Sequence, residues 1–304
     1  MRVITDQQIT GCLGYAEVAQ RIAQAFDALC QGRAAIKPRQ RIDCGAVKLS
    51  SMGAVWLDAG LAGEKVYPTV EGRFGFVFNL FDLRDGRPLA VMDGAELTRV
   101  RTAAMTTLAV SRGAAAFGKL ALFGAGLQGR SHLDALLAAL PFTRVDVVDP
   151  QDLGDWPRQA ALRHGVLLRQ CSAAEAVADA DVVVTITRSK TPVFDGALLK
   201  PGAFVAAVGT SLPTGRELDD TTLSRAGRVI VEWLPQSRGE AGEVVLGLQS
   251  GALDERRLAD LPGLAACGPA WRQDRDEILV FKSVGVGLSD LAAAAVVWER
   301  LGRA

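Results

Sequence analysis

The spacing of hydrophobic residues changes character about a third of the way along the chain. Near the N-terminus it predicts one amphipathic helix, Tyr15–Cys30, ending at Gly32, a residue type that readily takes the left-handed conformation at a helix C-terminus. The apolar face of this helix carries Val18, Ile22, Phe26 and Leu29. From Lys119 onwards, apolar runs of strand length alternate with segments of helical spacing. The two patterns predict two regions of different architecture.

Short strand-like runs after the first helix predict an antiparallel α+β region. The runs are Ile36–Asp43, Val47–Met52, Lys65–Val70 and Phe74–Phe81. The turn signal Asp85-Gly86 joins the last run to Leu89–Met92 as a hairpin. Phe74–Phe81 has apolar side chains on both faces, so we expect it to be covered on both sides, which is consistent with a subunit interface.

A helix over Ala95–Ser111, with Asp93 and Glu96 placed as an N-terminal cap pair, leads into the second region. The small residues of Gly113–Gly118 have the composition of a hinge between domains. Near the end of the chain, the apolar helix expected over Ser289–Leu301 has a composition that suits packing against the first region. We therefore expect a discontinuous domain of residues 1–112 and 276–304, with residues 113–275 inserted as a second domain.

The alternation of strands and helices after the hinge predicts a doubly wound parallel sheet, whose ligands bind beyond the carboxyl ends of the strands. The helix expected near Pro157–His164 stops at Gly165, and Ser172 with Glu175 forms a capping box for the next one. The expected strands are Leu120–Phe123, Val145–Val148, Val182–Thr187, Ala203–Val208 and Val229–Glu232.

The stretch Lys119–Arg130, KLALFGAGLQGR, is the clearest chemical signal in the sequence. Gly124 suits a tight turn, Gly126 lets the backbone approach a pyrophosphate, and Gly129 lets the helix pack on the strand. Asp149 follows the next strand, where a carboxylate can bind the adenosine ribose. The free N–H groups of the helix N-terminus would bind the phosphates. We expect the dinucleotide-binding loop to comprise Gly124, Ala125, Gly126, Leu127, Gln128 and Gly129.

Composition narrows the classes of partner. The 304 residues are 49% hydrophobic and 22% charged, as in ordinary soluble proteins, and 34 basic residues balance 34 acidic ones, so no net charge favours nucleic acid or an anionic membrane. There is neither an apolar signal segment nor a run of about 18 apolar residues, so we expect a cytoplasmic protein. We expect buried thiols, with no disulfide framework and no metal site, at Cys12, Cys30, Cys44, Cys171 and Cys267, an odd set without a CxxC pair.

Cations are the candidates for a substrate site. Arg101 lies among small residues, as expected where a guanidinium reaches into a cleft, whereas Arg99 points about 200° away on the same helix and is expected in solvent. Lys65 opens an otherwise apolar strand, where desolvation would lower the pKa of its amine and let it move protons. His132 and His164 are expected to be structural or surface residues.

A further cluster of cations is Lys37, Arg39 and Arg41, which would share one face of a strand. A solvated edge strand and a clamp for a substrate carboxylate agree equally well with this alternation.

Longer segments give the sequence a resemblance that covers nearly the whole chain. In order along the sequence they are PLAVMDGAELT, RTAAMTTLAV, LALFGAGLQGRSHLDAL, GTSLPTGRELDD and FKSVGVGLSD. Together they resemble the ornithine cyclodeaminase and mu-crystallin family. The resemblance implies a Rossmann dinucleotide-binding domain inserted into a discontinuous α+β domain for substrate binding and dimerisation, and hence a homodimer.

The resemblance also implies roles for individual residues. Lys65 matches the active-site lysine of the family, and Arg101 matches its carboxylate-binding arginine. The second carboxylate-binding arginine is Arg39 or Arg41, which the alternation does not distinguish. Asp149 matches the position that contacts the ribose. Independently of the resemblance, Thr185, Thr187 and Gly209 stand at the carboxyl ends of expected strands, and together with Ser283 they complete the expected cofactor contacts.

One departure from the family determines the expected activity. Ser211 occupies the position of the cyclodeaminases' catalytic aspartate, and serine cannot hold the charge that ornithine cyclisation needs. We therefore expect an NAD(P)-dependent oxidoreductase that reduces a small, cyclic α-imino acid, or interconverts it with an α-amino acid, with Ser211 among the substrate contacts. The alternatives are a cyclodeaminase-type ammonia-lyase that uses bound NAD, and a mu-crystallin-like ligand-binding protein that holds a dinucleotide.

The segment after the second strand bears on the choice of cofactor. Family members that hold a 2′-phosphate tend to have Asn-Arg-Thr there, whereas this chain has Asp149-Pro150-Gln151. We expect NAD(H) to be preferred and NADP(H) to be possible, in which case Arg158 is the nearby cation that would accommodate the extra phosphate.

Overall fold

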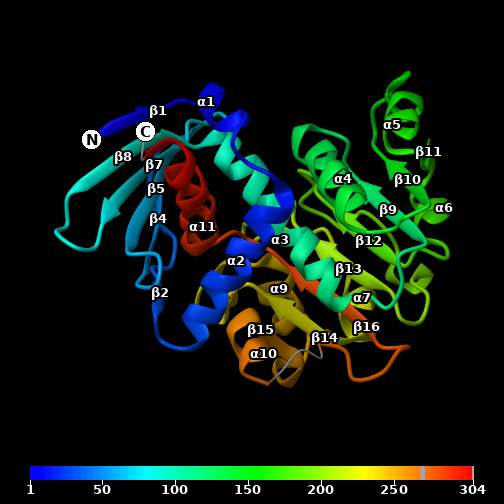
Figure 1. Cartoon of the computed structure of the whole chain (residues 1–304). Coiled ribbons are helices and arrows are strands. Elements are labelled where there is room, and N and C mark those ends of the chain that lie inside the picture. The colour runs from blue at the N-terminus through cyan, green and yellow to red at the C-terminus, as the bar shows by residue number, and fades with distance from the viewer. Residues whose placement is uncertain (268–270, 303–304) are drawn as a thin grey trace. The chain divides into compact units, whose positions relative to one another are not determined.

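The chain forms two compact units in the computed structural model, which describes residues 1–267 and 271–302, without the side chains of residues 266 and 267 (Figure 1). Unit 1 comprises Met1–Met105 and Gly285–Ala304, and unit 2 comprises Thr106–Val284. The first boundary lies inside α3 (Ala95–Gly113), because this helix continues unbroken to the glycine at which we expected a hinge. The second boundary follows β16 (Ile278–Lys282), because this strand belongs to the sheet of unit 2.

Unit 1 is built on a sheet in the order β1-β8-β7-β5-β4-β2, with β3 paired to β4 and β6 to β5. Its neighbouring strands are antiparallel except for β1 and β8. The expected hairpin at Asp85-Gly86 joins β7 to β8. The strands are β1 (Arg2–Ile4), β2 (Ala34–Ile36), β3 (Gln40–Cys44), β4 (Val47–Trp56), β5 (Leu61–Val70), β6 (Arg73–Phe74), β7 (Val77–Asp82) and β8 (Pro88–Asp93).

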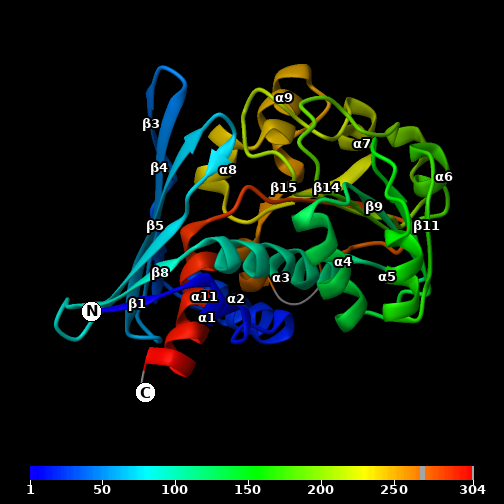
Figure 2. The ribbon, with the colours of Figure 1, turned by 90° about the horizontal axis from the view of Figure 1, so that it is seen from above.

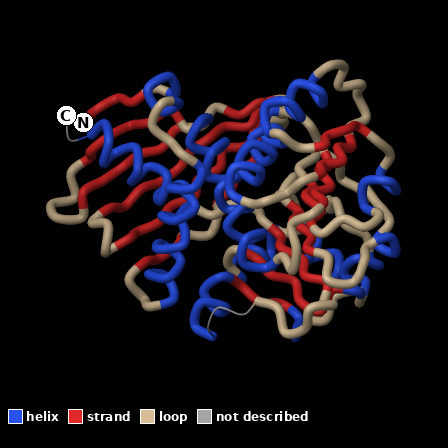
Figure 3. The backbone as a smooth tube through the Cα atoms, turned by 45° about the vertical axis from the view of Figure 1, so that its right-hand side comes forward, coloured by secondary structure: helices blue, strands red, loops and turns tan. Residues whose placement is uncertain are grey.

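Helices from both ends of the chain cover one face of this sheet. The last α-helix, α11 (Gly287–Val297), is buried along its whole length and lies beside α2 (Tyr15–Cys30) and across β4 and β5 (Figures 1 and 3). A π-helical turn, Trp298–Gly302, follows it. The expected helices at both ends of the chain are therefore present, and the apolar composition of α11 reflects its place inside unit 1.

The strand expectations need three corrections. Lys65 lies in the middle of β5, because the strand already begins at Leu61. Lys37, Arg39 and Arg41 do not share a strand face, since Lys37–Arg39, with Pro38 at its centre, separates β2 from β3. Within unit 1, β7 is buried on one face only: it packs against α11 and its Phe78 and Leu80 are fully buried, whereas Val77 on the other face is 37% exposed.

The N-terminus of α3 is capped from a distance, not by the expected pair. The Asp6 carboxylate, on α1 (Asp6–Thr10), accepts the Glu96 N–H at 2.9 Å, and Asp93 accepts the Asp6 N–H at 3.0 Å. Arg99 is not solvated as expected. Its guanidinium donates to Glu96 and, at 2.6 Å, to the Tyr15 hydroxyl, because this side of α3 faces the N-terminal segment.

The cysteines are less buried than expected. Cys12, Cys30 and Cys171 are half-buried free thiols, and Cys44 is exposed because it ends β3, an edge strand of unit 1. The side chain of Cys267 lies outside the described residues.

Unit 2 contains the expected doubly wound sheet, in the order β11-β10-β9-β12-β13-β16-β14-β15 with every neighbouring pair parallel. Helices lie on both faces (Figure 2), which explains why the central strands β9, β12, β13 and β16 are buried along their whole length and are mostly apolar. The strands are β9 (Lys119–Phe123), β10 (Arg144–Val148), β11 (Leu167–Gln170), β12 (Val182–Thr185), β13 (Phe204–Ala207), β14 (Ala226–Val231), β15 (Leu258–Asp260) and β16. The α-helices after α3 are α4 (Leu127–Ala139), α5 (Trp156–His164), α6 (Ala173–Val177), α7 (Asp220–Arg225), α8 (Leu234–Glu240), α9 (Gly242–Ser250) and α10 (Leu261–Cys267).

The strand order places the edge at which a ligand would bind. The chain runs from β9 to β10 on one side and later returns to β12 on the other, so the order reverses at β9. In such sheets, ligands bind beyond the carboxyl ends of the strands at this point. Among the described residues, no helix is long and apolar enough to cross a membrane.

The close approach of α11 to β4 provides a test of the packing in unit 1. A Cβ at Gly287 would lie 2.6 Å from the Gly53 carbonyl oxygen, whereas a Cβ at Gly239 in α8 would meet nothing within 4 Å. We expect Gly287→Ala to lower the free energy of unfolding by about 1–3 kcal/mol, because the added methyl group overpacks the junction. Gly239→Ala, the matched control, should leave it unchanged or raise it slightly. Thermal and urea unfolding followed by circular dichroism measures both, and equal stabilities would contradict this description of the junction.

Candidate functional site

Three charged side chains from separate elements meet in the interior of unit 1. Lys65 lies on β5, Arg101 on α3 and Asp290 in the first turn of α11. The Lys65 Nζ donates to Asp290 Oδ1 at 2.8 Å, and the Arg101 Nε donates to the same oxygen at 3.0 Å. The Lys65 and Asp290 side chains are only 3% and 1% exposed. One buried carboxylate thus holds two cations.

Burial and charge set the protonation of this cluster. Desolvation lowers the pKa of the Lys65 amine to about 7, against the attraction of Asp290 and with the help of the positive charges of Arg101 and Arg39. Burial alone would raise the pKa of Asp290, but Arg101 and Lys65 outweigh it and hold that pKa below its usual value. The cluster therefore pairs a permanent carboxylate with an amine that can gain or lose a proton near neutral pH.

Gly285 brings a second arginine to the cluster. The Arg39 Nη2 donates to the Gly285 carbonyl at 2.9 Å, and a Cβ on Gly285 would lie 2.9 Å from both Nη atoms of Arg101. Gly285 has a φ of +77°, so both steric space and backbone conformation favour glycine here. Arg41, the alternative to Arg39, lies on β3, whose strand partner is β4.

Aromatic rings surround the Lys65 amine. Its Nζ lies 5.8 Å from the ring centroid of Tyr67 and 5.4 Å from that of Phe76. The Tyr67 and Phe76 centroids are 5.0 Å apart, and Phe74 stacks on Phe76 at 5.5 Å. We call Tyr67, Phe74 and Phe76 the aromatic wall. It gives the cation cluster an apolar neighbour of the kind that contacts a planar or ring-shaped ligand.

In unit 2, the glycine loop after β9 has the geometry that a dinucleotide needs. Gly124 has a φ of +96°, and a Cβ at Gly129 would lie 1.9 Å from the Gly124 carbonyl oxygen, so the turn and the packing of α4 both require glycine. A Cβ at Gly126 would meet nothing within 4 Å, so the space there is available to a ligand. Asp149 holds this loop, since its Oδ2 accepts the Ala125 N–H at 2.8 Å. These residues fit a pyrophosphate and ribose.

A buried glutamate fixes the neighbouring strand ends of unit 2. The Glu217 carboxylate accepts the Thr187 N–H and hydroxyl through Oε1 and the Gly209 N–H through Oε2, at 2.7–2.8 Å. Its own N–H donates to Glu243, which pairs with the buried Lys282 at 2.8 Å. Two candidate cofactor contacts, Thr187 and Gly209, are therefore held by one side chain.

The remaining predicted cofactor contacts lie at the same edge of the sheet. Thr185 ends β12, and within the described part of the chain its buried hydroxyl has no hydrogen-bond partner. Ser283 follows β16 and is buried. Leu127 and Gln128 begin α4, next to the glycine turn. This edge of the sheet therefore carries the glycine turn after β9, the Thr185 hydroxyl and the loops that Glu217 fixes.

The segment after β13 contains Ser211 and two aspartates, Asp219 and Asp220, whose surroundings differ from those of Ser211. Ser211 is half-buried, two residues beyond Gly209. Asp219 instead caps α7 and also accepts the Gly196 N–H, while Asp220 pairs with Arg216. Both aspartates therefore have structural partners at the start of α7.

The histidines have structural partners. His132 is fully buried between the Gln128 carbonyl and the Thr106 hydroxyl, and His164 contacts Asp134 at 2.8 Å.

Our sequence analysis did not identify Asp290 or Glu217 as site residues. Both stand in the segments that carry the family resemblance, FKSVGVGLSD and GTSLPTGRELDD. Their roles come from contacts that sequence spacing does not reveal, since Asp290 meets residues 225 and 189 positions away.

Comparison with known proteins gives a consistent picture. The sequence profile of the Ornithine cyclodeaminase/mu-crystallin family matches residues 5–304. The chain is 34% identical over 238 residues to the Delta(1)-pyrroline-2-carboxylate reductase of Colwellia psychrerythraea, a match that covers 73% of this chain and 72% of that protein.

Solved structures agree with the sequence match. A crystal structure of a probable ornithine cyclodeaminase from Bordetella pertussis Tohama I is 42% identical, with a TM-score of 0.95 over 100% of this chain and 97% of the other. The iminosuccinate reductase of Paracoccus denitrificans, in complex with NAD+, is 26% identical, with a TM-score of 0.91 over 98% and 95%. The glycine loop, the order of the elements and these similarities lead to one conclusion: the chain belongs to the ornithine cyclodeaminase/mu-crystallin family.

Proposed function

We propose that this protein is an NAD(H)-dependent reductase of small cyclic α-imino acids. The observation that carries the proposal is the buried lysine with a pKa near 7 that shares a carboxylate with an arginine. A reductase of this class needs a cation for the substrate carboxylate and a proton donor for the imine nitrogen. Support also comes from the relatives, which include reductases of pyrroline-2-carboxylate and of iminosuccinate.

The residues of unit 1 divide these tasks. Arg101 has its two Nη groups available for a ligand, because its hydrogen bond to Asp290 uses Nε, and a guanidinium can hold a carboxylate by two parallel bonds. Arg39 is the second cation in the proposal, in preference to Arg41, because its charge acts on Lys65. Lys65 would donate its proton to the imine nitrogen. When bound in unit 2, NADH would supply the hydride that the α-carbon accepts.

The aromatic wall supports a cyclic substrate. The rings of Tyr67 and Phe76 lie within 6 Å of the Lys65 amine, where the substrate nitrogen would be. A five- or six-membered imine ring gains apolar contact with these faces, whereas an open-chain side chain bearing a second charge would be desolvated against them.

The second candidate is a cyclodeaminase, which the name of the Bordetella pertussis protein favours. Ser211 argues against it, because cyclisation of ornithine needs a carboxylate at that position. The partners of Asp219 and Asp220 support the same conclusion. The proposal retains Ser211 as an uncharged contact to the substrate.

We also propose that the protein is a homodimer, formed through the outer face of the unit 1 sheet. This face carries Glu64 and Asn79 and also exposes Val55 and Val77, each 37% exposed. It is hollowed by a shallow depression of about 450 Å³ lined by Val55, Ala62 and Phe81, with the Lys37–Glu64 ion pair beside them. Contiguous apolar surface of this kind marks an interaction site, and a two-fold axis would cover the same patch on both copies.

The first test is turnover. Purified protein given NADH and a cyclic imine carboxylate should consume them in equal amounts, while L-ornithine and NAD should yield little proline or ammonia. For reduction, kcat/KM should fall as the pH rises through about 7, because Lys65 must be protonated to act as the acid. Robust ammonia release from ornithine without net cofactor turnover would establish the cyclodeaminase instead, and tight NADH binding without any turnover would indicate a ligand-binding protein.

The second test concerns the carboxylate. Arg101→Lys should lower kcat/KM for the imine about 100-fold, because lysine keeps the charge but cannot form two parallel bonds to a carboxylate. Arg112→Lys, an exposed arginine on the same helix, is the matched control and should retain full activity. A nearly normal kcat/KM in Arg101→Lys would remove Arg101 from the substrate site.

The third test concerns the cofactor. A carboxylate at Asp149 repels a 2′-phosphate, so kcat/KM with NADH should exceed that with NADPH at least tenfold, about 1.4 kcal/mol. Asp149→Asn should reduce this ratio, even if weaker support of the Ala125 N–H lowers both activities. Asp155→Asn, in the same exposed segment, should leave the ratio unchanged. Equal use of both cofactors by the unaltered protein would overturn the preference and direct attention to Arg158.

The fourth test concerns assembly. Sedimentation equilibrium should give twice the chain mass of 32.1 kDa. Val55→Asp should shift the protein towards the monomer, because it buries a charge in the proposed interface. Leu162→Asp, on the exposed surface of α5, is the control and should not change the mass. A monomeric wild-type protein would refute the dimer.

A further inference from the structure

The Asp290 carboxylate has an unusual set of partners. Its Oδ1 accepts from both Lys65 and Arg101, while its buried Oδ2 has no hydrogen-bond partner in the described part of the chain. A carboxylate has two acceptor oxygens and could bind one cation on each. The shared oxygen instead brings the two cations to one point.

The contacts of Arg101 show which of its nitrogen atoms Asp290 uses. Asp290 takes the Nε, which lies on the side of the guanidinium, and not the terminal Nη pair. Gly285 leaves room at that pair, since a Cβ there would come within 2.9 Å of both Nη atoms. Asp290 thereby orients the guanidinium, and within the described part of the chain the two Nη groups form no hydrogen bond to the protein.

We propose that Asp290 is a positioning residue that couples the two tasks of the site: it keeps Lys65 protonated and aimed, and it orients Arg101 so that both Nη groups can receive the substrate carboxylate. The inference rests on the proposed function and names a residue that governs it. Asp290 is not itself the acid, because the cations around it favour its ionised form.

Because Lys65 and Arg101 share one oxygen of Asp290, this carboxylate keeps a charged partner after Lys65 has given up its proton. When the Lys65 N–H bond breaks and the proton bonds to the imine nitrogen, the amine becomes neutral and Asp290 remains paired with Arg101. The carboxylate is never left as an unpaired charge in the interior, which would be strongly destabilising.

Few other charged groups of unit 1 act on the Lys65 amine. The positive charges of Arg101 on α3 and Arg39 between β2 and β3 both lower its pKa. Tyr67 on β5 and Phe76 present ring faces, and the Thr98 hydroxyl of α3 lies 3.5 Å away. Among the largest influences on this pKa, the Asp290 carboxylate is the charge that raises it. Removing the charge of Asp290 while keeping the shape of its side chain should therefore lower the pKa of Lys65.

The test is Asp290→Asn in the full chain. Asparagine keeps the oxygen that accepts from Lys65 and Arg101 but loses the charge. The sequence has seven lysines, so the 13Cε signals of 13C-labelled lysine can be followed individually by NMR, with Lys65→Arg assigning the signal of interest. We expect the Lys65 titration midpoint to fall by at least one pH unit in Asp290→Asn. An unchanged or higher midpoint would overturn the proposal.

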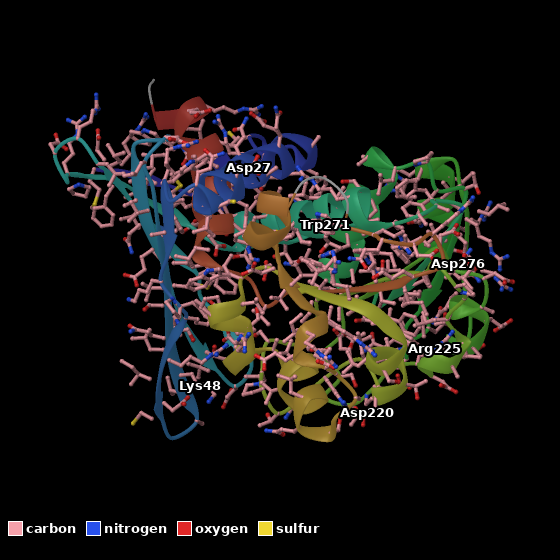
Figure 4. The ribbon with its side chains drawn as sticks, turned by 90° about the horizontal axis from the view of Figure 1, so that it is seen from below. Asp27, Lys48, Asp220, Arg225, Trp271 and Asp276 are labelled. Carbon is pink, nitrogen blue, oxygen red and sulfur yellow. The ribbon has the colours of Figure 1, made fainter. Side chains whose placement is uncertain are left out.

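The pH profile of imine reduction gives an independent measurement. If the Lys65 midpoint is one unit lower in Asp290→Asn, the ratio of its kcat/KM to that of wild type should be roughly tenfold smaller at pH 8 than at pH 5. The reason is that a smaller fraction of Lys65 is protonated in the variant at pH 8. A residue with only a structural role would reduce activity equally at every pH. The matched control is Asp27→Asn on the exposed side of α2 (Figure 4), which should match wild type throughout.

A second variant covers the case in which Asp290→Asn does not fold. Arg101→Met removes the neighbouring positive charge and leaves Asp290 to Lys65 alone, so the Lys65 midpoint should rise, and an unchanged or lower midpoint would contradict the coupling. The NMR measurements need neither substrate nor cofactor. If the wild-type protein reduces no imine, the proposed function fails, while the midpoints still decide whether Asp290 controls Lys65.

Discussion

The candidate substrate site depends on one constraint: a buried cation needs a compensating anion. Lys65 sits on a central strand of unit 1 with its side chain removed from water, where an isolated ammonium would lose its proton. Asp290 compensates for it from α11, a helix at the other end of the chain. The attraction between the two is a reason for α11 to pack against β4 and β5, and it ties the substrate site to the discontinuity of the domain.

In unit 2, a buried carboxylate fixes the loops at the edge of the sheet where a ligand would bind. The edge of its parallel sheet must present free backbone N–H groups to a ligand, yet the loops that carry them must not collapse. Close packing at Gly129 fixes the glycine turn, and the buried Glu217 carboxylate ties the loops after β12 and β13 together. Rigid loops of this kind preorganise a cofactor site, and the ordering is completed when the protein folds.

The two proposals for unit 1, substrate class and proton control, follow from the surroundings of one amine. A charged cluster beside the aromatic wall favours a ligand with one carboxylate and an apolar ring. In the proposed function, a serine at position 211 argues against cyclodeamination, and the depressed pKa of Lys65 suits proton donation at neutral pH. Members of this family would thus share one fold and differ in the reaction they catalyse through a few side chains at the site.

The sequence by itself determined the doubly wound sheet and the glycine turn, because their periodicity and glycine spacing are local properties that strand and helix geometry impose directly. It also identified Lys65 and Arg101 as candidates, since a cation in an apolar context is visible locally. Only the tertiary structure decided that Arg39 leaves the strand at Pro38, that Asp6 caps α3, and that Asp290 joins Lys65 to Arg101. These depend on contacts between distant segments, and no local pattern encodes which distant group will compensate a buried charge.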